Sequence, residues 1–222
     1  MSRKIFSYKV DVQTSGNHIW DRMPIQDFID SEPRLIRPAN YPNAVPGNGY
    51  YIAQCGEVQI GVVNLMGRTY MRDLDCPFQV GGRIVDEIRK TTPIIFVDIH
   101  AEATSEKQAM AHFLEGRVTG VFGTHTHVQT ADEQVSRAGT AYITDVGMTG
   151  PHDSIIGMEK APSLGRFLTG MPKRMSTASD DVKLSAVIVD LDSETGRATN
   201  IIRFQEDFDL SDFQPNASYG EN

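Results

Sequence analysis

One short apolar run limits the folds open to this chain more than any other stretch. Ile94 to Val97 are four consecutive large apolar residues, and they come directly before Asp98 and His100. Such a run predicts a strand buried on both faces, as strands of parallel sheets are. Parallel strands need a crossover connection, which is usually a helix. The run therefore predicts an α/β protein.

The flanking sequence supplies the helices and further strands that such a fold needs. Helices are expected from about Phe78 to Lys90, and from an N-cap at Thr104 to about Glu115, ending at Gly116. Strands alternate with these helices and then give way to hairpins, which predicts an α/β domain with a mixed sheet. The expected strands are Val10 to Val12, Tyr50 to Ala53, Val58 to Leu65, Val118 to Phe122, Ala141 to Ile143, Leu184 to Leu191 and Ala198 to Phe204, with a helix beginning at Pro24, a short helix at Leu164 to Leu168 and an irregular loop at 33–49.

Length and charge limit the classes of function. With 222 residues the chain is expected to form a single domain over 1–208, followed by a polar, frayed tail at 209–222. A net charge of −8 argues against stable nucleic-acid binding, which needs clustered Lys and Arg. A small phosphorylated substrate held through a metal stays open. With no membrane-length apolar run and no signal peptide, a cytoplasmic location and no membrane partner are expected.

Three expected strand ends carry side chains that bind metals. Asn17 follows Gly16, His100 ends the apolar run, and His125 and His127 follow Gly123. In open α/β sheets functional groups collect at the carboxyl ends of strands, so these four side chains are expected to converge on one metal or two. Imidazole suits zinc, iron, manganese or nickel, and an amide oxygen favours manganese or iron. The set therefore predicts a catalytic transition-metal site.

Each of these residues also has a structural interpretation. Asn17 and His18 after a glycine are typical of a turn, and His100 is equally consistent with a core histidine bonded to backbone. Asp98 is expected to orient a neighbouring group instead of binding metal. Glu102 is expected to be a carboxylate near a helix start, where the helix dipole favours negative charge.

The motifs occur in the order seen in the calcineurin-like metallophosphoesterase superfamily. The segments around them resemble its bacterial branch of 2′,3′-cyclic-nucleotide phosphodiesterases, and the similarity extends over about Val10 to Phe204. The resemblance implies a metallophosphoesterase-type αββα sandwich with mixed sheets. The similar segments are Thr14 to Asp21, Arg37 to Pro42, Asn64 to Thr69, Asp98 to Lys107, Gly123 to Asp132 and Ile143 to Pro151.

The resemblance also implies roles for individual residues. Asn17, His100 and His125 would bind one metal, and His127 would bind a second. His18 would act as the general acid that protonates the leaving oxygen. The implied cofactor is a pair of divalent transition metals, iron or manganese, with zinc as an alternative, and the implied substrate is a small phosphodiester or nucleotide.

The chain also departs from the family pattern. The family opens with a strand ending in Gly-Asp-Val-Val-Gly and a second ending in Asn-Gly-Glu-Asn, and their acidic metal ligands have no counterpart before Val10. The fold is thus expected to be N-terminally incomplete, with a second metal held by His127 alone, weakly or not at all. Unpaired sheet edges would favour a homo-oligomer.

Three readings of the function follow. The first is a metal-dependent phosphodiesterase, weakened by the missing ligands. The alternative is a non-catalytic metallophosphoesterase remnant that binds metal or a partner. An amidohydrolase using the His-x-His motif is disfavoured, because that class would need a barrel of repeats and would leave Gly16-Asn17-His18 unexplained.

Overall fold

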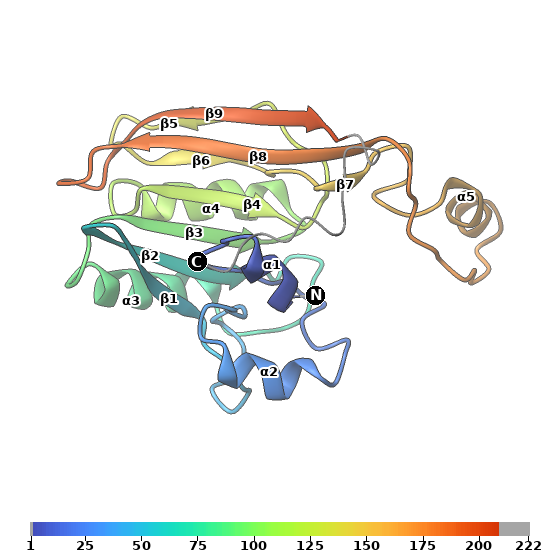
Figure 1. Cartoon of the computed structure of the whole chain (residues 1–222), viewed down its shortest axis with the longest axis horizontal. Helices are drawn as coiled ribbons and strands as arrows, with labels where there is room; N and C mark the ends of the chain where they lie inside the picture. The colour runs from blue at the N-terminus through green and yellow to red at the C-terminus, as the bar shows by residue number, and fades with distance from the viewer. Residues whose placement is uncertain (1, 209–222) are drawn as a thin grey trace.

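A six-stranded mixed sheet forms the centre of the computed structural model, which describes residues 2–208 (Figure 1). Its strand order is β1-β2-β3-β4-β6-β5. The four central strands β2, β3, β4 and β6 run parallel, and β1 and β5 are antiparallel edges. The predicted mixed α/β fold is confirmed. The strands are β1 Tyr50–Cys55, β2 Val58–Met66, β3 Ile95–His100, β4 Gly120–Thr124, β5 Gln134–Val135 and β6 Ala141–Ile143.

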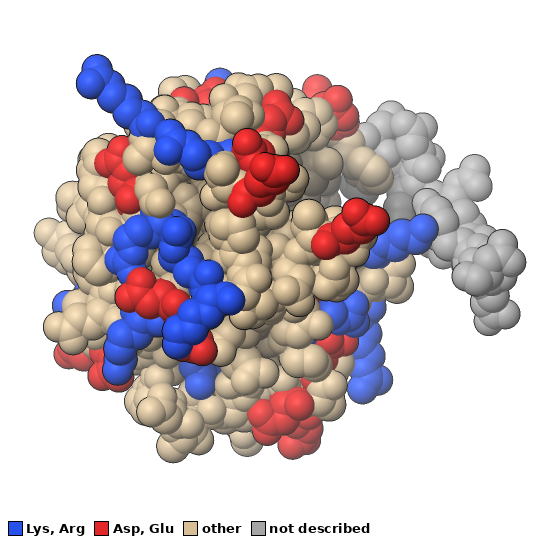
Figure 2. All heavy atoms as spheres, turned by 90° about the vertical axis from the view of Figure 1, so that its left-hand side faces the viewer, with Lys and Arg blue, Asp and Glu red and all other residues tan. Residues whose placement is uncertain are grey.

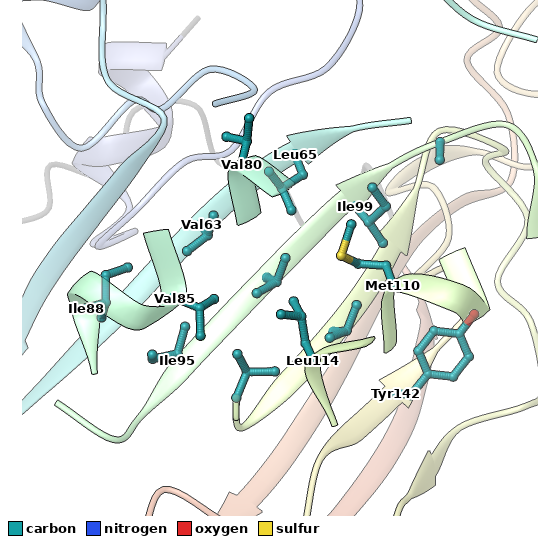
Figure 3. Close-up of a cluster of buried hydrophobic side chains, with 14 residues drawn as sticks. Val63, Leu65, Val80, Val85, Ile88, Ile95, Ile99, Met110, Leu114 and Tyr142 are labelled. Atoms are coloured by element: carbon teal, nitrogen blue, oxygen red, sulfur yellow. The ribbon is translucent and has the colours of Figure 1, made fainter. Parts of the chain in front are cut away.

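Helices α3 (Pro77–Ile88) and α4 (Thr104–Leu114) cover one face of this sheet. Figure 3 shows the apolar side chains that meet between them, with Val85 and Ile88 from α3 packed against Ile95 of β3. Met110 of α4 is fully buried in the same cluster. Burying this continuous apolar surface provides the main stabilisation of the domain.

A second sheet packs on the other face of the large one. It consists of β7 (Gly150–Pro151), β8 (Val182–Leu191) and β9 (Ala198–Asp207), in that order. Ala198 and Ile201 of β9 are buried against Ala141 of β6. The described residues thus form three layers of the expected sandwich: helices, large sheet, small sheet.

The remaining helices lie outside these layers. They are α1 (Ser2–Ser7), α2 (Ile25–Ser31) and α5 (Lys160–Thr169), and α5 extends away from the sheets (Figure 1). Within the described part of the chain, no helix is long and apolar enough to cross a membrane. The tail expected at 209–222 lies outside the described residues. The single domain over 1–208, the incomplete N-terminus and self-association stay predictions.

Most expected elements are present, with three informative corrections. The strand expected at Val10 to Val12 is wrong, because Gln13 forms backbone hydrogen bonds with the segment Arg34–Ile36 instead of joining a sheet. The helix cap expected at Thr104 is wrong, since Ala103 is the N-cap and Thr104 already lies in the helix. The β4 strand extends to Thr124, two residues further than expected, and this extension matters for the site.

Candidate active site

Strand register brings three polar side chains together at the end of β3. Along β3, Ile95, Val97 and Ile99 pack into the core beneath the helices, so the alternate residues Asp98 and His100 face the other way. His100 pairs in register with Thr124 of β4. Thr124 Oγ1 lies 3.0 Å from His100 Nδ1 and donates to Asp98 Oδ1 at 2.7 Å. Asp98 thus contacts a neighbour of His100, as expected for an orienting carboxylate.

The loop carrying Asn17 is held over this strand end by a side chain of β2. Asn64 Nδ2 donates to the carbonyl oxygens of Ser15 and Ile36, at 2.7 and 3.2 Å. The loop comes so close that a Cβ added to Gly16 would lie 2.2 Å from the His100 ring. Only glycine allows this approach. Asn17 Oδ1 lies 2.8 Å from His100 Nε2 as a result.

His125 completes the cluster from the loop after β4. Its Nδ1 lies 3.1 Å from His100 Nε2, and its Nε2 lies 3.2 Å from a Glu102 carboxylate oxygen. Glu102 therefore contacts the site in addition to standing near the start of α4. The backbone of His125 has φ 99°, and that of His127 has φ 66°. Non-glycine residues in this region carry strain of about 1–3 kcal/mol each, so the surrounding structure must hold them.

A buried ion pair holds this strained loop. Asp145 Oδ2 accepts from the backbone N–H of Thr126 at 3.0 Å and from its hydroxyl at 2.6 Å. Lys107 Nζ of α4 donates to the same oxygen at 3.0 Å, and both side chains of the pair are only 1% exposed. Neither residue was predicted from the sequence to belong to the site. Asp145, like Asp98, closely follows an apolar strand, and that position was the available signal.

Burial sets the charge of the cluster. It lowers the pKa of His100 to about 3, an effect strengthened by nearby His125 and Lys107. Burial also lowers the pKa of His125, against the opposing effect of Glu102. Burial raises the pKa of Asp98 to about 6, opposed by hydrogen bonds from Thr14 and Thr124. The two imidazoles are therefore neutral at neutral pH, which is the form that binds metals.

The structure places the other two predicted histidines differently. His127 is exposed, and its Nδ1 donates to the carbonyl oxygen of Ile156 at 2.9 Å. The His18 side chain is 79% exposed, with Nδ1 2.8 Å from a carboxylate oxygen of Asp21. The structure thus brings together Asn17, His100 and His125.

The three inward-facing atoms fit one divalent cation. Asn17 Oδ1 and His125 Nδ1 lie 2.8 and 3.1 Å from His100 Nε2, about the separation of neighbouring ligand atoms whose bonds to a metal are near 2 Å. An amide oxygen with two imidazole nitrogens suits a transition metal. Among residues 2–208, no group of three or more His, Cys, Asp or Glu side chains is placed to hold a metal. Asn17 Oδ1 is the third atom of the candidate set, beside the two imidazole nitrogens.

Several known proteins are similar to this chain in sequence and in fold. A family model described as YmdB-like protein matches residues 1–204. The 2′,3′-cyclic-nucleotide 2′-phosphodiesterase of Bacillus subtilis is 48% identical over 193 residues, which cover 87% of this chain and 73% of the relative. A hypothetical protein of Thermus thermophilus has a crystal structure with TM-score 0.87 and 40% identity, covering 93% of this chain and 80% of that one. A novel phosphatase of Mycoplasma pneumoniae gives TM-score 0.84 and 29% identity, covering 93% and 76%.

These matches place the chain in a class whose chemistry is phosphoester hydrolysis. The chain belongs to the YmdB-like family of calcineurin-like phosphoesterases. It is therefore a hydrolytic enzyme of the metallophosphoesterase kind, a class that generally uses divalent metals.

Proposed function

We propose that this chain is a metal-dependent phosphodiesterase that hydrolyses 2′,3′-cyclic nucleotides or related small phosphodiesters. The observation that carries the proposal is the convergence of Asn17 Oδ1 and His125 Nδ1 on His100 Nε2, at 2.8 and 3.1 Å. The 48% identity to the Bacillus phosphodiesterase supports the choice of substrate.

Asn17, His100 and His125 are the proposed ligands of one divalent transition metal, iron or manganese in preference to zinc. When bound, such a metal lowers the pKa of a water and neutralises charge on the phosphoryl oxygens. His127 is the proposed ligand of a second metal. Its Nδ1 donates to the carbonyl oxygen of Ile156, so its Nε2 lone pair is free to bind a metal.

His18 is the proposed general acid. Its Nδ1 lies 2.8 Å from a carboxylate oxygen of Asp21, a contact that orients the ring. The Nε2–H is then the proton given to the leaving oxygen. The 79% exposure of the His18 side chain leaves it open to a substrate arriving from solvent.

Surface charge supports a small substrate over a polymer. The net charge is −8. Figure 2 shows the face on which the central parallel strands begin, opposite the strand ends that carry the site, and there the Lys and Arg side chains lie among Asp and Glu. Binding along a nucleic-acid backbone needs many clustered cations. A single phosphodiester group held by a metal does not.

Metal loading combined with a hydrolysis assay tests the proposal. The chain is treated with a chelator, and Mn²⁺, Fe²⁺ or Zn²⁺ is returned before metal content and turnover of 2′,3′-cyclic AMP and bis-p-nitrophenyl phosphate are measured. The expected result is bound metal with turnover in the wild type, and loss of both in His100→Ala. The control is His112→Ala, since the His112 side chain is 83% exposed on α4 and paired with Glu115.

Two results would contradict the proposal. Bound metal without turnover would favour the non-catalytic alternative. Equal turnover in wild type and His100→Ala would remove the proposed site.

A further inference from the structure

Behind His100, on the side away from Asn17, lies a chain of hydrogen bonds that ends at a buried carboxylate. It runs from His100 Nδ1 to Thr124 Oγ1 at 3.0 Å, and from Thr124 Oγ1 to Asp98 Oδ1 at 2.7 Å. None of these three atoms belongs to the inward-facing set formed by Asn17 Oδ1, His100 Nε2 and His125 Nδ1. Their effect on that set is therefore indirect.

The direction of these bonds follows from counting protons. A threonine hydroxyl has one proton to donate. Thr124 donates it to Asp98, so its oxygen can only accept from His100. The proton in the second bond must then belong to His100 Nδ1. A neutral imidazole carries one N–H, so His100 Nε2 is left with a lone pair.

Two independent contacts keep this direction from reversing. The Thr14 side chain is a second hydrogen-bond partner of the Asp98 carboxylate, from a separate segment. The register of β3 and β4 fixes Thr124 beside His100. The whole arrangement thus depends on backbone pairing that is already part of the sheet.

On the side of His100 that faces Asn17 and His125, the result is a group of lone pairs. His100 Nε2 faces the oxygen of Asn17 at 2.8 Å. His125 Nε2 lies 3.2 Å from the Glu102 carboxylate, which can only accept, so its Nδ1 also turns a lone pair toward His100, at 3.1 Å. In this tautomer no proton lies between His100 Nε2 and either neighbour, so neither contact is a hydrogen bond in the metal-free chain. A cation between the three atoms satisfies all of them.

We propose that Thr124 and Asp98 are positioning residues, which hold His100 in the Nδ1–H tautomer and thereby direct its Nε2 lone pair at the metal. This proposal rests on the proposed function, because the lone pair is directed at the metal which that function requires. Metal-binding histidines commonly donate their second ring N–H to a carboxylate, a backbone carbonyl or water. Here the second ring nitrogen donates to a hydroxyl, which in turn donates to a carboxylate. The tautomer itself is a property of the metal-free chain.

Nitrogen-15 NMR of the metal-free chain tests the tautomer directly. The His100 ring is expected to show a protonated Nδ1 and an unprotonated Nε2. Thr124→Val removes the hydroxyl at nearly constant shape and should lose this fixed tautomer, whereas Thr124→Ser should retain it. Thr124→Ala is the second variant if Thr124→Val does not fold. The control is Thr199→Val, an exposed threonine in β9 whose hydroxyl bonds a backbone oxygen.

Calorimetric titration with Mn²⁺ gives a second readout. Loss of an outer partner of a ligating histidine typically costs 10–100-fold in metal affinity, so Thr124→Val should bind Mn²⁺ about 10–100-fold more weakly than wild type. Thr124→Ser and Thr199→Val should bind like wild type. A purely structural role for Thr124 would lower the melting temperature without moving the tautomer.

The failure of this proposal can be told from failure of the proposed function. A wild-type His100 protonated mainly at Nε2, or a Thr124→Val variant with the wild-type tautomer, overturns the positioning role whatever the hydrolysis assay gives. Absence of turnover in a metal-loaded wild type overturns the phosphodiesterase assignment, while the tautomer measured in the metal-free chain still stands.

Discussion

His100 and His125 differ from His18 and His127 in how firmly the fold holds them. Both ring nitrogens of His100 and His125 have a polar neighbour at 2.8–3.2 Å. These neighbours are Thr124 of β4, the loop residues Asn17 and Glu102, and the other histidine. His18 and His127 are exposed and each makes one contact through Nδ1. His100 is placed by the register of β3 and β4, and His125 by the strained loop that the Lys107–Asp145 pair holds. His18 and His127 lie in loops.

The contrast suggests that the two pairs of histidines have different roles. A metal ligand must hold its donor atom in a fixed position, which rigid support provides. A small displacement of such an atom can lower the reaction rate substantially. A proton donor that meets a substrate in solvent needs access. The predictions below test this difference in role, beginning with the largest expected effect.

Replacing the exposed histidine proposed as the acid should have the largest effect. His18→Gln is expected to lower the turnover of 2′,3′-cyclic AMP by about 10²–10⁴-fold, the usual contribution of a general acid. The loss with bis-p-nitrophenyl phosphate should be much smaller, because nitrophenolate leaves without a proton. Steady-state kinetics with the two substrates measures the difference. Equal losses on both would refute the acid role.

Breaking the pair that holds the strained loop should destabilise the protein. Asp145→Asn leaves the Lys107 charge buried without a counter-charge, which typically costs about 3–5 kcal/mol. Urea unfolding measures this free energy. The matched control is Asp153→Asn, which breaks an exposed pair with Lys160 and should cost less than about 1 kcal/mol. Similar losses in both variants would show that the buried pair has no special role.

Filling the space between the Asn17 loop and β3 should separate the ligands. Gly16→Ala places a methyl group 2.2 Å from the His100 ring, so the ring or the loop must move. A displacement of this kind is expected to lower kcat/KM by about 100-fold. The control is Gly165→Ala in α5, where the added Cβ makes only ordinary contacts, at 3.4 Å or more. Unchanged activity in Gly16→Ala would mean that the observed approach is not needed for function.

The smallest effect is expected at the partner of His18. Asp21→Asn removes an ion pair whose side chains are 79% and 62% exposed. Such pairs contribute about 0.2–1 kcal/mol, so turnover should fall less than about fivefold, and the difference should shrink in high salt. Kinetics at low and high ionic strength measures it. A loss as large as that of His18→Gln would show that Asp21 has a role beyond its charge.

The sequence predicted those parts of the molecule that depend on local pattern. The run at Ile94 to Val97 leads into β3 (Ile95–His100), whose residues alternate between buried and half-buried. The strands expected at Leu184 to Leu191 and Ala198 to Phe204 lie within β8 and β9, which pair as a hairpin. The choice of Asn17, His100 and His125 as neighbours came from strand ends and from family resemblance. The metal-binding roles stay predictions.

The rest depends on contacts between distant residues. Thr124 was not expected to join the site, because the strand was predicted to end at Phe122 and pairing with His100 requires the register of β3 and β4. Lys107 lies in a largely polar helix, and its burial becomes visible only when Asp145 is brought beside it. His127 donates to a carbonyl oxygen 29 residues away, which no local pattern encodes.

The separation of the three inner side chains along the chain has a thermodynamic consequence. Asn17 and His100 are 83 residues apart, and His100 and His125 are 25 residues apart. An ion bound by all three would act as a removable cross-link that closes two long loops of the unfolded chain. Because such an ion binds only the folded form, its free concentration would set the melting temperature, which chelators would lower.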